Sequence, residues 1–198
     1  MKAYFLFAGL GLLAACGETP PDGPLVELYP NGRKQFEGTI RGGYKNGPAV
    51  HYARSGAKEA EGSYKDGEKD GSWTYWWTSG KPRERGVYRT GKREGAWVRW
   101  HANGQKFWEG GFVRDKKEGP WTQWWENGNL YLQGEHENDK REGPWTEWRK
   151  DGQKRSEGSY SAWLKEGPWT FWNADGSIDT EKAGVYAENA RVGDLKEQ

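Results

Sequence analysis

The sequence predicts an all-β protein, an elongated single-layer antiparallel β-meander built from 24-residue β-hairpin repeats. Composition is the first observation that predicts this fold. The 198 residues include 14 Trp, 10 Tyr, 6 Phe and 30 Gly but only 19 Leu, Ile and Val, too few for helical stripes or buried parallel strands. Periodicity is the second, because glycines return every 24 residues in three separate columns. We therefore expect aromatic rings to take the place of an aliphatic core.

A shortage of aliphatic residues can also indicate disorder, but other features of the composition oppose that interpretation. Disordered chains are poor in aromatics and usually carry a large net charge, whereas this chain has 14 Trp and a formal net charge of +1. The balanced charge also argues against a nucleic-acid partner, because neutralising phosphates needs a basic surplus on one face. We expect an ordered chain that does not bind nucleic acid.

Residues 1–15 have the pattern of a secretion signal. Lys2 supplies the positive start, residues 4–13 are apolar, and a small-residue cleavage site ends in Cys16, the only cysteine. The apolar run is too short to span a bilayer. The pattern resembles a bacterial lipoprotein signal, which implies cleavage before Cys16 and acylation of that residue. A buried hydrophobic hairpin with a free thiol is the structural alternative.

Lipidation at Cys16 would attach the mature protein to a membrane, because two or more acyl chains give stable anchoring. Residues 16–24 are rich in Pro and Gly and are expected to form a short extended tether. Gly17 does not resemble the aspartate that retains lipoproteins at the inner membrane. The resemblance therefore implies a lipid-anchored envelope protein at the outer membrane, facing the periplasm.

Residues 25–186 are expected to form six full repeats and a partial seventh, followed by a polar tail over 187–198. One glycine column consists of Gly38, Gly62, Gly86, Gly110, Gly134 and Gly158. The first tryptophan column consists of Trp73, Trp97, Trp121, Trp145 and Trp169. The second consists of Trp76, Trp100, Trp124, Trp148 and Trp172. Because residues three apart in a strand point to opposite faces, we expect the two columns on different faces of the sheet.

Asn-Gly or Asp-Gly pairs are expected in the hairpin loops, where a positive φ is needed. They are Asn31-Gly32, Asn103-Gly104, Asn127-Gly128, Asp151-Gly152 and Asp175-Gly176. With a two-residue loop, Trp121 pairs with Gly134, so that an indole could cover the bare backbone of its neighbour. A three-residue loop would shift this register by one residue, and the sequence leaves the choice open.

The repeat resembles the MORN repeat, the membrane occupation and recognition nexus, in its bacterial variant form. The matching segments are Glu61 to Gly67, Glu157 to Tyr160, and the Gly-x-Trp steps ending at Trp73, Trp97 and Trp121. The resemblance covers about residues 27–186. It implies a single-layer sheet used for protein contacts. Bacterial members include lipoproteins and a YwqK-type antitoxin-like family, and an antitoxin would need a cytoplasmic form without lipid.

Five aromatic side chains depart from the columns and are the candidate partner-binding residues. They are Trp77, Phe107, Trp108, Trp125 and Trp163. Trp163 occupies a turn where the other repeats have Gly or Asp. One expectation is that these rings form an exposed aromatic strip that docks a partner protein or stacks on sugar rings. The alternative is that they cover glycines and thicken a sheet that has no second layer.

Two columns of charged residues accompany the aromatic ones. The first consists of Lys45, Lys69, Arg93, Lys117, Arg141 and Lys165, each followed by Asn or an acidic residue. We expect these residues to solvate an edge and discourage aggregation, with a ligand groove as the alternative. The second column consists of Glu37, Glu61, Glu109 and Glu157, for which we expect paired surface charge.

Catalytic chemistry finds little support in the sequence. His51, His101 and His136 occupy three different columns, so the repeat does not gather them into a metal site. Neither a Gly-x-Ser-x-Gly motif nor a phosphate loop is visible. We predict a protein-binding scaffold without catalytic residues, cofactor or metal. A binder of cell-wall glycan or peptidoglycan using Trp108, Trp125 and Trp163, and a toxin-neutralising protein, are the alternatives.

The last repeat is irregular. After Gly176 the next glycine, Gly184, arrives two residues later than the period requires. A terminal repeat must blunt the open edge of the array, and this segment is the expected cap.

Overall fold

A computed structural model describes residues 20–195, in which every helix or strand assigned is a β-strand. The chain divides into two compact units between Glu94 and Gly95. The predicted all-β meander of antiparallel hairpin repeats is confirmed in both units. The predicted signal over 1–15 and Cys16 lie outside the described residues. Within residues 20–195 there is no helix with the length and apolar character needed to cross a membrane.

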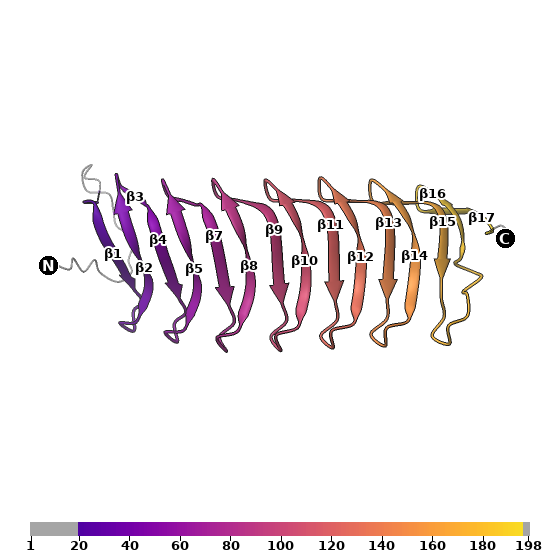
Figure 1. Ribbon diagram of the computed structural model, residues 1–198, viewed down its shortest axis with the longest axis horizontal. Coiled ribbons are helices and arrows are strands. Elements are labelled where there is room, and N and C mark those ends of the chain that lie inside the picture. Colours follow the sequence, from indigo (N-terminus) through magenta and orange to yellow (C-terminus); the bar gives the residue numbers. More distant parts are fainter. Residues whose placement is uncertain (1–19, 196–198) are drawn as a thin grey trace. The chain divides into compact units, whose positions relative to one another are not determined.

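Unit 1 contains the first eight strands, which follow one another in chain order (Figure 1). They are β1 (Gly23–Leu28), β2 (Lys34–Arg41), β3 (Tyr44–Lys45), β4 (Gly47–Tyr52), β5 (Lys58–Lys65), β6 (Glu68–Lys69), β7 (Gly71–Trp76) and β8 (Pro82–Arg89). Strands β3 and β6 are the short first parts of returning strands that continue as β4 and β7. Each hairpin therefore pairs with the next one along the chain.

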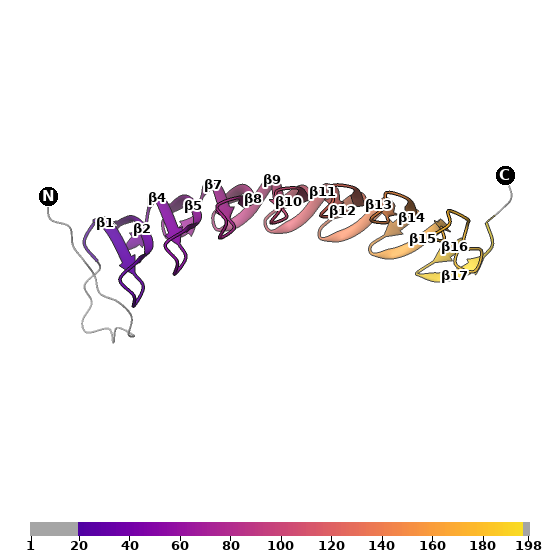
Figure 2. The same ribbon diagram turned by 90° about the horizontal axis from the view of Figure 1, so that it is seen from below.

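Unit 2 continues the same arrangement from β9 (Lys92–Trp100), which begins just before the boundary between the units. The later strands are β10 (Lys106–Val113), β11 (Lys116–Trp124), β12 (Leu130–Glu137), β13 (Lys140–Trp148), β14 (Lys154–Ser161), β15 (Leu164–Phe171), β16 (Gly184–Ala187) and β17 (Ala190–Gly193). Figure 2 shows β16 and β17 beyond β15. Strand β17, which was predicted as polar tail, pairs with β16.

The Asn-Gly and Asp-Gly hairpins close with a three-residue loop. In the loop between β11 and β12, the N–H of Trp125 donates to the carbonyl of Asn129 at 2.8 Å. Gly128 takes the left-handed conformation, with a φ of 89°, and the Asn127 side chain accepts the N–H of Asn129 at 3.1 Å. A bulge then shifts the register by one residue, so Trp121 still pairs with Gly134. The loop thus has three residues, whereas the register of the two strands is the one expected for a two-residue loop.

The hairpins close at the opposite end with two-residue turns. Both central residues of these turns have a positive φ, as in a type I′ turn. The turns comprise Gly42-Gly43, Asp66-Gly67, Thr90-Gly91, Arg114-Asp115, Asn138-Asp139, Ala162-Trp163 and Glu188-Asn189. Such a turn occupies only two residues, so the next strand begins immediately after it.

The first tryptophan column forms the core. Trp145 retains 2% of its surface, and its ring lies between His136, at 5.1 Å, and Tyr160, at 6.3 Å, both edge-on. A Cβ atom built on Gly134 would lie 2.2 Å from Cδ2 of Trp145, so the indole occupies the space above that glycine. The predicted covering of glycines by indoles is confirmed. The covered glycine lies on the preceding strand, however, since Trp121 covers Gly110 rather than Gly134.

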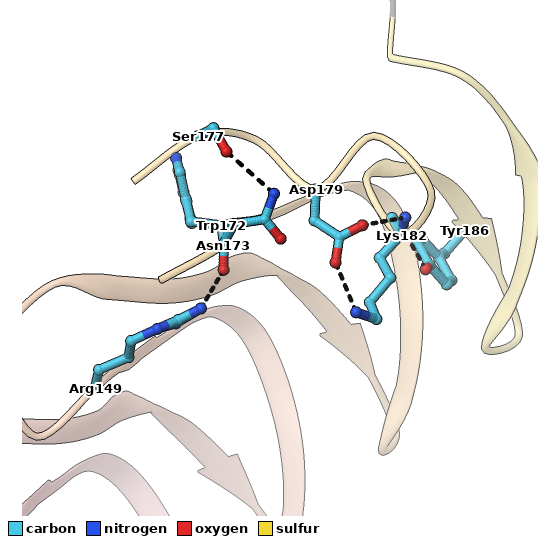
Figure 3. Close-up of polar contacts among 7 residues, drawn as sticks. All are labelled: Arg149, Trp172, Asn173, Ser177, Asp179, Lys182 and Tyr186. Carbon is cyan, nitrogen blue, oxygen red and sulfur yellow. Dashed lines mark hydrogen bonds and ion pairs between the residues drawn. The ribbon is translucent and has the colours of Figure 1, made fainter. Parts of the chain in front are cut away.

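The two-residue extension in the last repeat folds back against β15. The N–H of Asp179 donates to the carbonyl of Phe171 at 2.8 Å, and Trp172 forms an isolated bridge with Ile178. Asp179 also pairs with Lys182 at 2.6 Å (Figure 3). We call residues 173–183 the closing loop. It occupies the position that a regular hairpin strand would take and places Ala183 in a buried position.

Candidate functional site

The two faces of the sheet carry different chemistry. We call the face with the buried tryptophan column the inner face, and the face with the second tryptophan column the outer face. On the outer face the predicted pairing of surface charge is confirmed, because lysines and glutamates three residues apart form ion pairs. These pairs are Lys34–Glu37 at 2.9 Å, Lys58–Glu61 at 2.5 Å, Lys106–Glu109 at 2.7 Å and Lys154–Glu157 at 2.6 Å. The charges of these outer-face pairs cancel.

The column of Lys and Arg residues lies on the inner face, half-buried over aromatic rings. Lys69 Nζ lies 4.5 Å from the ring centroid of Trp73, and the guanidinium carbon of Arg141 lies 4.6 Å from that of Trp145. Lys165 Nζ lies within 5.2 Å of three rings, those of Trp169, Phe171 and Tyr186. The prediction that this column solvates an edge is therefore wrong. The cations instead make cation–π contacts, worth about 0.5–2 kcal/mol each.

The acidic neighbours of these cations are engaged elsewhere. The Glu118 carboxylate accepts the N–H of Asn138 at 2.9 Å, and the Glu142 carboxylate accepts that of Ala162 at 2.7 Å. Each acid thus supports the two-residue turn of the next hairpin. The inner face consequently carries its cations without the adjacent acids.

Burial shifts the pKa of several inner-face groups. Desolvation lowers the pKa of Lys69 and of Lys165, because the charged ammonium loses water over the aromatic rings. Burial, followed by the positive charge of Lys117, also lowers the pKa of His136. His136 is therefore favoured in its neutral form, and its Nδ1–H donates to the Asp139 carbonyl at 3.1 Å.

This shift predicts that the protein becomes less stable in acid. A His with a lowered pKa in the folded state stays neutral there while the unfolded chain takes up a proton. The resulting stability is present above the unfolded pKa and is lost as the pH falls through the folded pKa. Replacing His136 with phenylalanine, the residue at the equivalent position 112, should reduce the loss between pH 7.5 and pH 5 in urea titrations. An unchanged pH profile would contradict this role of His136.

Trp163 is the most exposed of the five predicted partner-binding residues. It retains 45% of its surface at the second position of a two-residue turn, with a φ of 79°. The ring lies 5.7 Å from that of His136, and the Arg141 guanidinium lies 5.4 Å from its centroid. A left-handed conformation costs a non-glycine residue about 1–2 kcal/mol. Trp163 is therefore held in an unfavourable backbone conformation beside the inner face.

The other four predicted residues are part of the packing. Trp108 retains 7% of its surface and stacks on Trp121 at 4.8 Å, so it offers no exposed platform. Trp125 is half-buried and donates its indole N–H to the Trp148 carbonyl of the next hairpin at 3.1 Å. Phe107 is half-buried against His101 at 4.7 Å, and Trp77, in unit 1, is half-buried near Arg83. The structure does not bring these four into an exposed strip with Trp163.

Two cavities on the inner face were missed by the sequence-based predictions. One, of about 210 Å³, adjoins Ala60 in unit 1, and the other, of about 440 Å³, adjoins Ser156 in unit 2. Both residues belong to one column, in which other repeats have large side chains such as Phe36, Trp108 and Leu132. The small residues in this column were the sequence signal for the cavities.

Residues 20–195 contain no cluster of three or more His, Cys, Asp or Glu side chains arranged to hold a metal ion. The chemistry of the inner face is instead that of cations on aromatic rings. Such a surface can bind and orient a ligand.

Comparison with known proteins agrees with the hairpin repeat. Residues 117–138, which cover most of β11 and all of β12, match the family described as MORN repeat variant. No curated protein matches the chain.

Proposed function

Because the chain is a MORN-repeat protein, we propose that it is a non-catalytic scaffold that binds a protein partner on its inner face. Repeats of this family are generally scaffolds without catalytic activity. We further propose that the scaffold is anchored through lipid on Cys16 in the bacterial envelope, at the outer membrane and facing the periplasm.

Trp163 is the observation that carries the protein-binding proposal. The equivalent positions hold residue types that tolerate a positive φ, so the turn itself does not need an indole; they are Gly43, Gly67, Gly91, Asp115 and Asp139. Backbone strain that the fold does not require is a feature of functional positions. Tryptophan and arginine are also the residues that most often dominate protein interfaces, and Arg141 lies against the Trp163 ring.

Replacing Trp163 with glycine should separate binding from stability. Glycine accepts the left-handed turn without strain, which offsets the lost ring contacts, so the unfolding free energy should change by less than about 1 kcal/mol. Chemical crosslinking in intact cells should lose the partner band in this variant. Trp125→Ala, which removes a packed tryptophan, is the matched control and should retain the band in whatever fraction remains folded. Undiminished crosslinking of a folded Trp163→Gly variant would contradict the proposal.

The structure favours a protein partner over a glycan. Of the three tryptophans proposed as sugar platforms, Trp108 is buried and Trp125 is held in a hydrogen bond to the next hairpin. Trp163 therefore lacks the neighbouring platforms that a run of sugar rings would need. Tryptophan fluorescence that responds to cell-wall fragments in the wild type, but not in Trp163→Gly, would favour the glycan alternative instead.

Anchoring can be tested by metabolic labelling with palmitate. The wild-type protein should incorporate label and fractionate with outer membranes, whereas Cys16→Ser should do neither, because the acylated sulfur is absent. Wild-type protein without label would contradict the lipid anchor. Such a result would favour the cytoplasmic toxin-neutralising alternative.

A further inference from the structure

The two inner-face cavities occupy equivalent places in the repeat. Equivalent residues in the linings of the two cavities lie 96 residues apart in the sequence, which is four repeats of 24. The unit 1 cavity is lined by Ala60, Tyr64, Lys69 and Tyr75, and the unit 2 cavity has Ser156, Tyr160, Lys165 and Phe171 at those positions. Each cavity therefore forms where a small side chain leaves space beneath the ammonium of an inner-face lysine.

One substitution distinguishes the two lysines. In unit 1 the Lys69 ammonium donates to the Tyr75 hydroxyl at 2.6 Å, and that hydroxyl donates to Tyr88 at 3.1 Å. In unit 2, Phe171 occupies the position equivalent to Tyr75, so there is no hydroxyl at that position to accept a hydrogen bond from Lys165. Among residues 20–195, the Lys165 ammonium has contacts with aromatic rings but neither a hydrogen bond nor an ion pair. Lys165 is therefore available to an anion that enters the cavity.

The closing loop and Arg149 complete the wall of the unit 2 cavity. Arg149 donates through one terminal nitrogen to the Trp172 carbonyl (Figure 3), while its other terminal nitrogen is buried without a partner in the described chain. Asn173, Asp179 and Lys182 of the closing loop also line the cavity. A buried guanidinium nitrogen without a partner costs free energy, which an anionic ligand would offset.

The charge lining this cavity defines the ligand. Arg149, Arg155, Lys165 and Lys182 face two acids, Glu147 and Asp179, which leaves two positive charges in excess. Glu147 pairs with Arg155 at 2.8 Å, and Asp179 pairs with Lys182. The excess therefore resides on Arg149 and Lys165, above a floor that includes Trp169 and Phe171.

We propose that the unit 2 cavity receives a glutamate or aspartate side chain of the protein partner, with its carboxylate on Lys165 and Arg149. This inference rests on the proposed function. A volume of about 440 Å³ lies within the usual range for ligand sites and is ample for one acidic side chain with its flanking backbone. Partner segments rich in acidic residues follow from the proposal.

The test uses the full chain and a peptide of the sequence Gly-Glu-Gly, blocked at both ends. Lysines are labelled with acetic anhydride, and modification at each one is measured by mass spectrometry. Lys165 is only half-buried, so its amine can be labelled and its protection by the peptide followed directly. The Glu peptide should protect Lys165, and the Gln counterpart should bind about tenfold more weakly or not at all.

Two variants locate the site, with binding measured by calorimetry. Ser156→Leu fills the cavity with the residue found at position 132, and Lys165→Met removes the charge but keeps the stem. Both should weaken binding of the Glu peptide about tenfold or more. Lys117→Met, in the same column but over Trp121, should change binding less than about twofold.

Several results would overturn the inference. They are equal binding of the Glu and Gln peptides, unchanged binding by Ser156→Leu, and binding only of a peptide with a free terminal carboxylate. Failure here is distinguishable from failure of the scaffold proposal. Crosslinking that is lost in Trp163→Gly but kept in Ser156→Leu would retain the scaffold and reject the cavity as its acidic-residue site.

Discussion

Replacing Trp145 with alanine is expected to lower the free energy of unfolding by about 3–5 kcal/mol. The indole is almost fully buried between His136 and Tyr160, and it covers Gly134. Its removal would eliminate edge-on aromatic contacts on both sides, each worth about 0.5–1.5 kcal/mol beyond the buried area. Because repeats interact chiefly with their neighbours, the change should affect the hairpins of β12, β13 and β14 most strongly.

Urea unfolding followed by circular dichroism and hydrogen exchange would measure this effect. Trp148→Ala is the matched control, because this tryptophan is half-buried on the outer face of the same strand. The control should lose clearly less stability than Trp145→Ala. Equal losses would contradict the assignment of the core to the inner face.

The second large effect is expected from Gly134→Ala. The added Cβ would lie 2.2 Å from Cδ2 of Trp145, far inside the contact distance, and the indole is confined by the rings on either side. Excess volume in a packed core costs about 1–3 kcal/mol and occasionally more, and we expect the upper end of that range. Thermal unfolding would measure the loss.

Two comparisons isolate the clash at Gly134. Gly193→Ala should be close to neutral, because its Cβ would meet nothing within 4 Å. In the double variant with Trp145→Ala, the additional cost of Gly134→Ala should largely disappear, since the two residues act through one contact. A fully additive double variant would mean that the alanine is unfavourable for a reason other than the indole.

Much of this fold could be predicted from the sequence because its determinants are local. Glycines and Asn-Gly pairs mark the ends of short strands, and alternation along a strand separates Trp145 from Trp148 on opposite faces. The Trp121–Gly134 register is one of the two that the sequence left open, and it arises from a three-residue loop followed by a bulge. Sequence alone could not choose between them because the bulge has no local marker in this hairpin.

The inner-face cations could not be placed because their position depends on the length of a turn. The turn after β12 uses only Asn138 and Asp139, so Arg141 lies in β13 and reaches the ring of Trp145. The sequence had instead suggested that this guanidinium lies at a solvated edge of the sheet. Glu142, the next residue, supports the following turn instead of pairing with Arg141.

The candidate site was predicted only in part. Trp163 was identified because it breaks the repeat, and a break in a regular pattern is visible without a structure. The cavity beside Ser156 depends on what surrounds a small side chain, and the closing loop that walls it has no counterpart in the other repeats. The burial of Trp108 likewise depends on its stacking against Trp121.

Arg155 and Lys154 offer the most direct test of the proposal that the inner face binds a protein partner. These neighbouring, exposed residues point to opposite faces: Arg155 pairs with Glu147 on the inner face and Lys154 with Glu157 on the outer face. A photo-crosslinking amino acid would be placed at each position in turn, in intact cells. A partner bound to the inner face should be crosslinked from position 155 and not from position 154. Crosslinking from position 154 alone would contradict binding on the inner face.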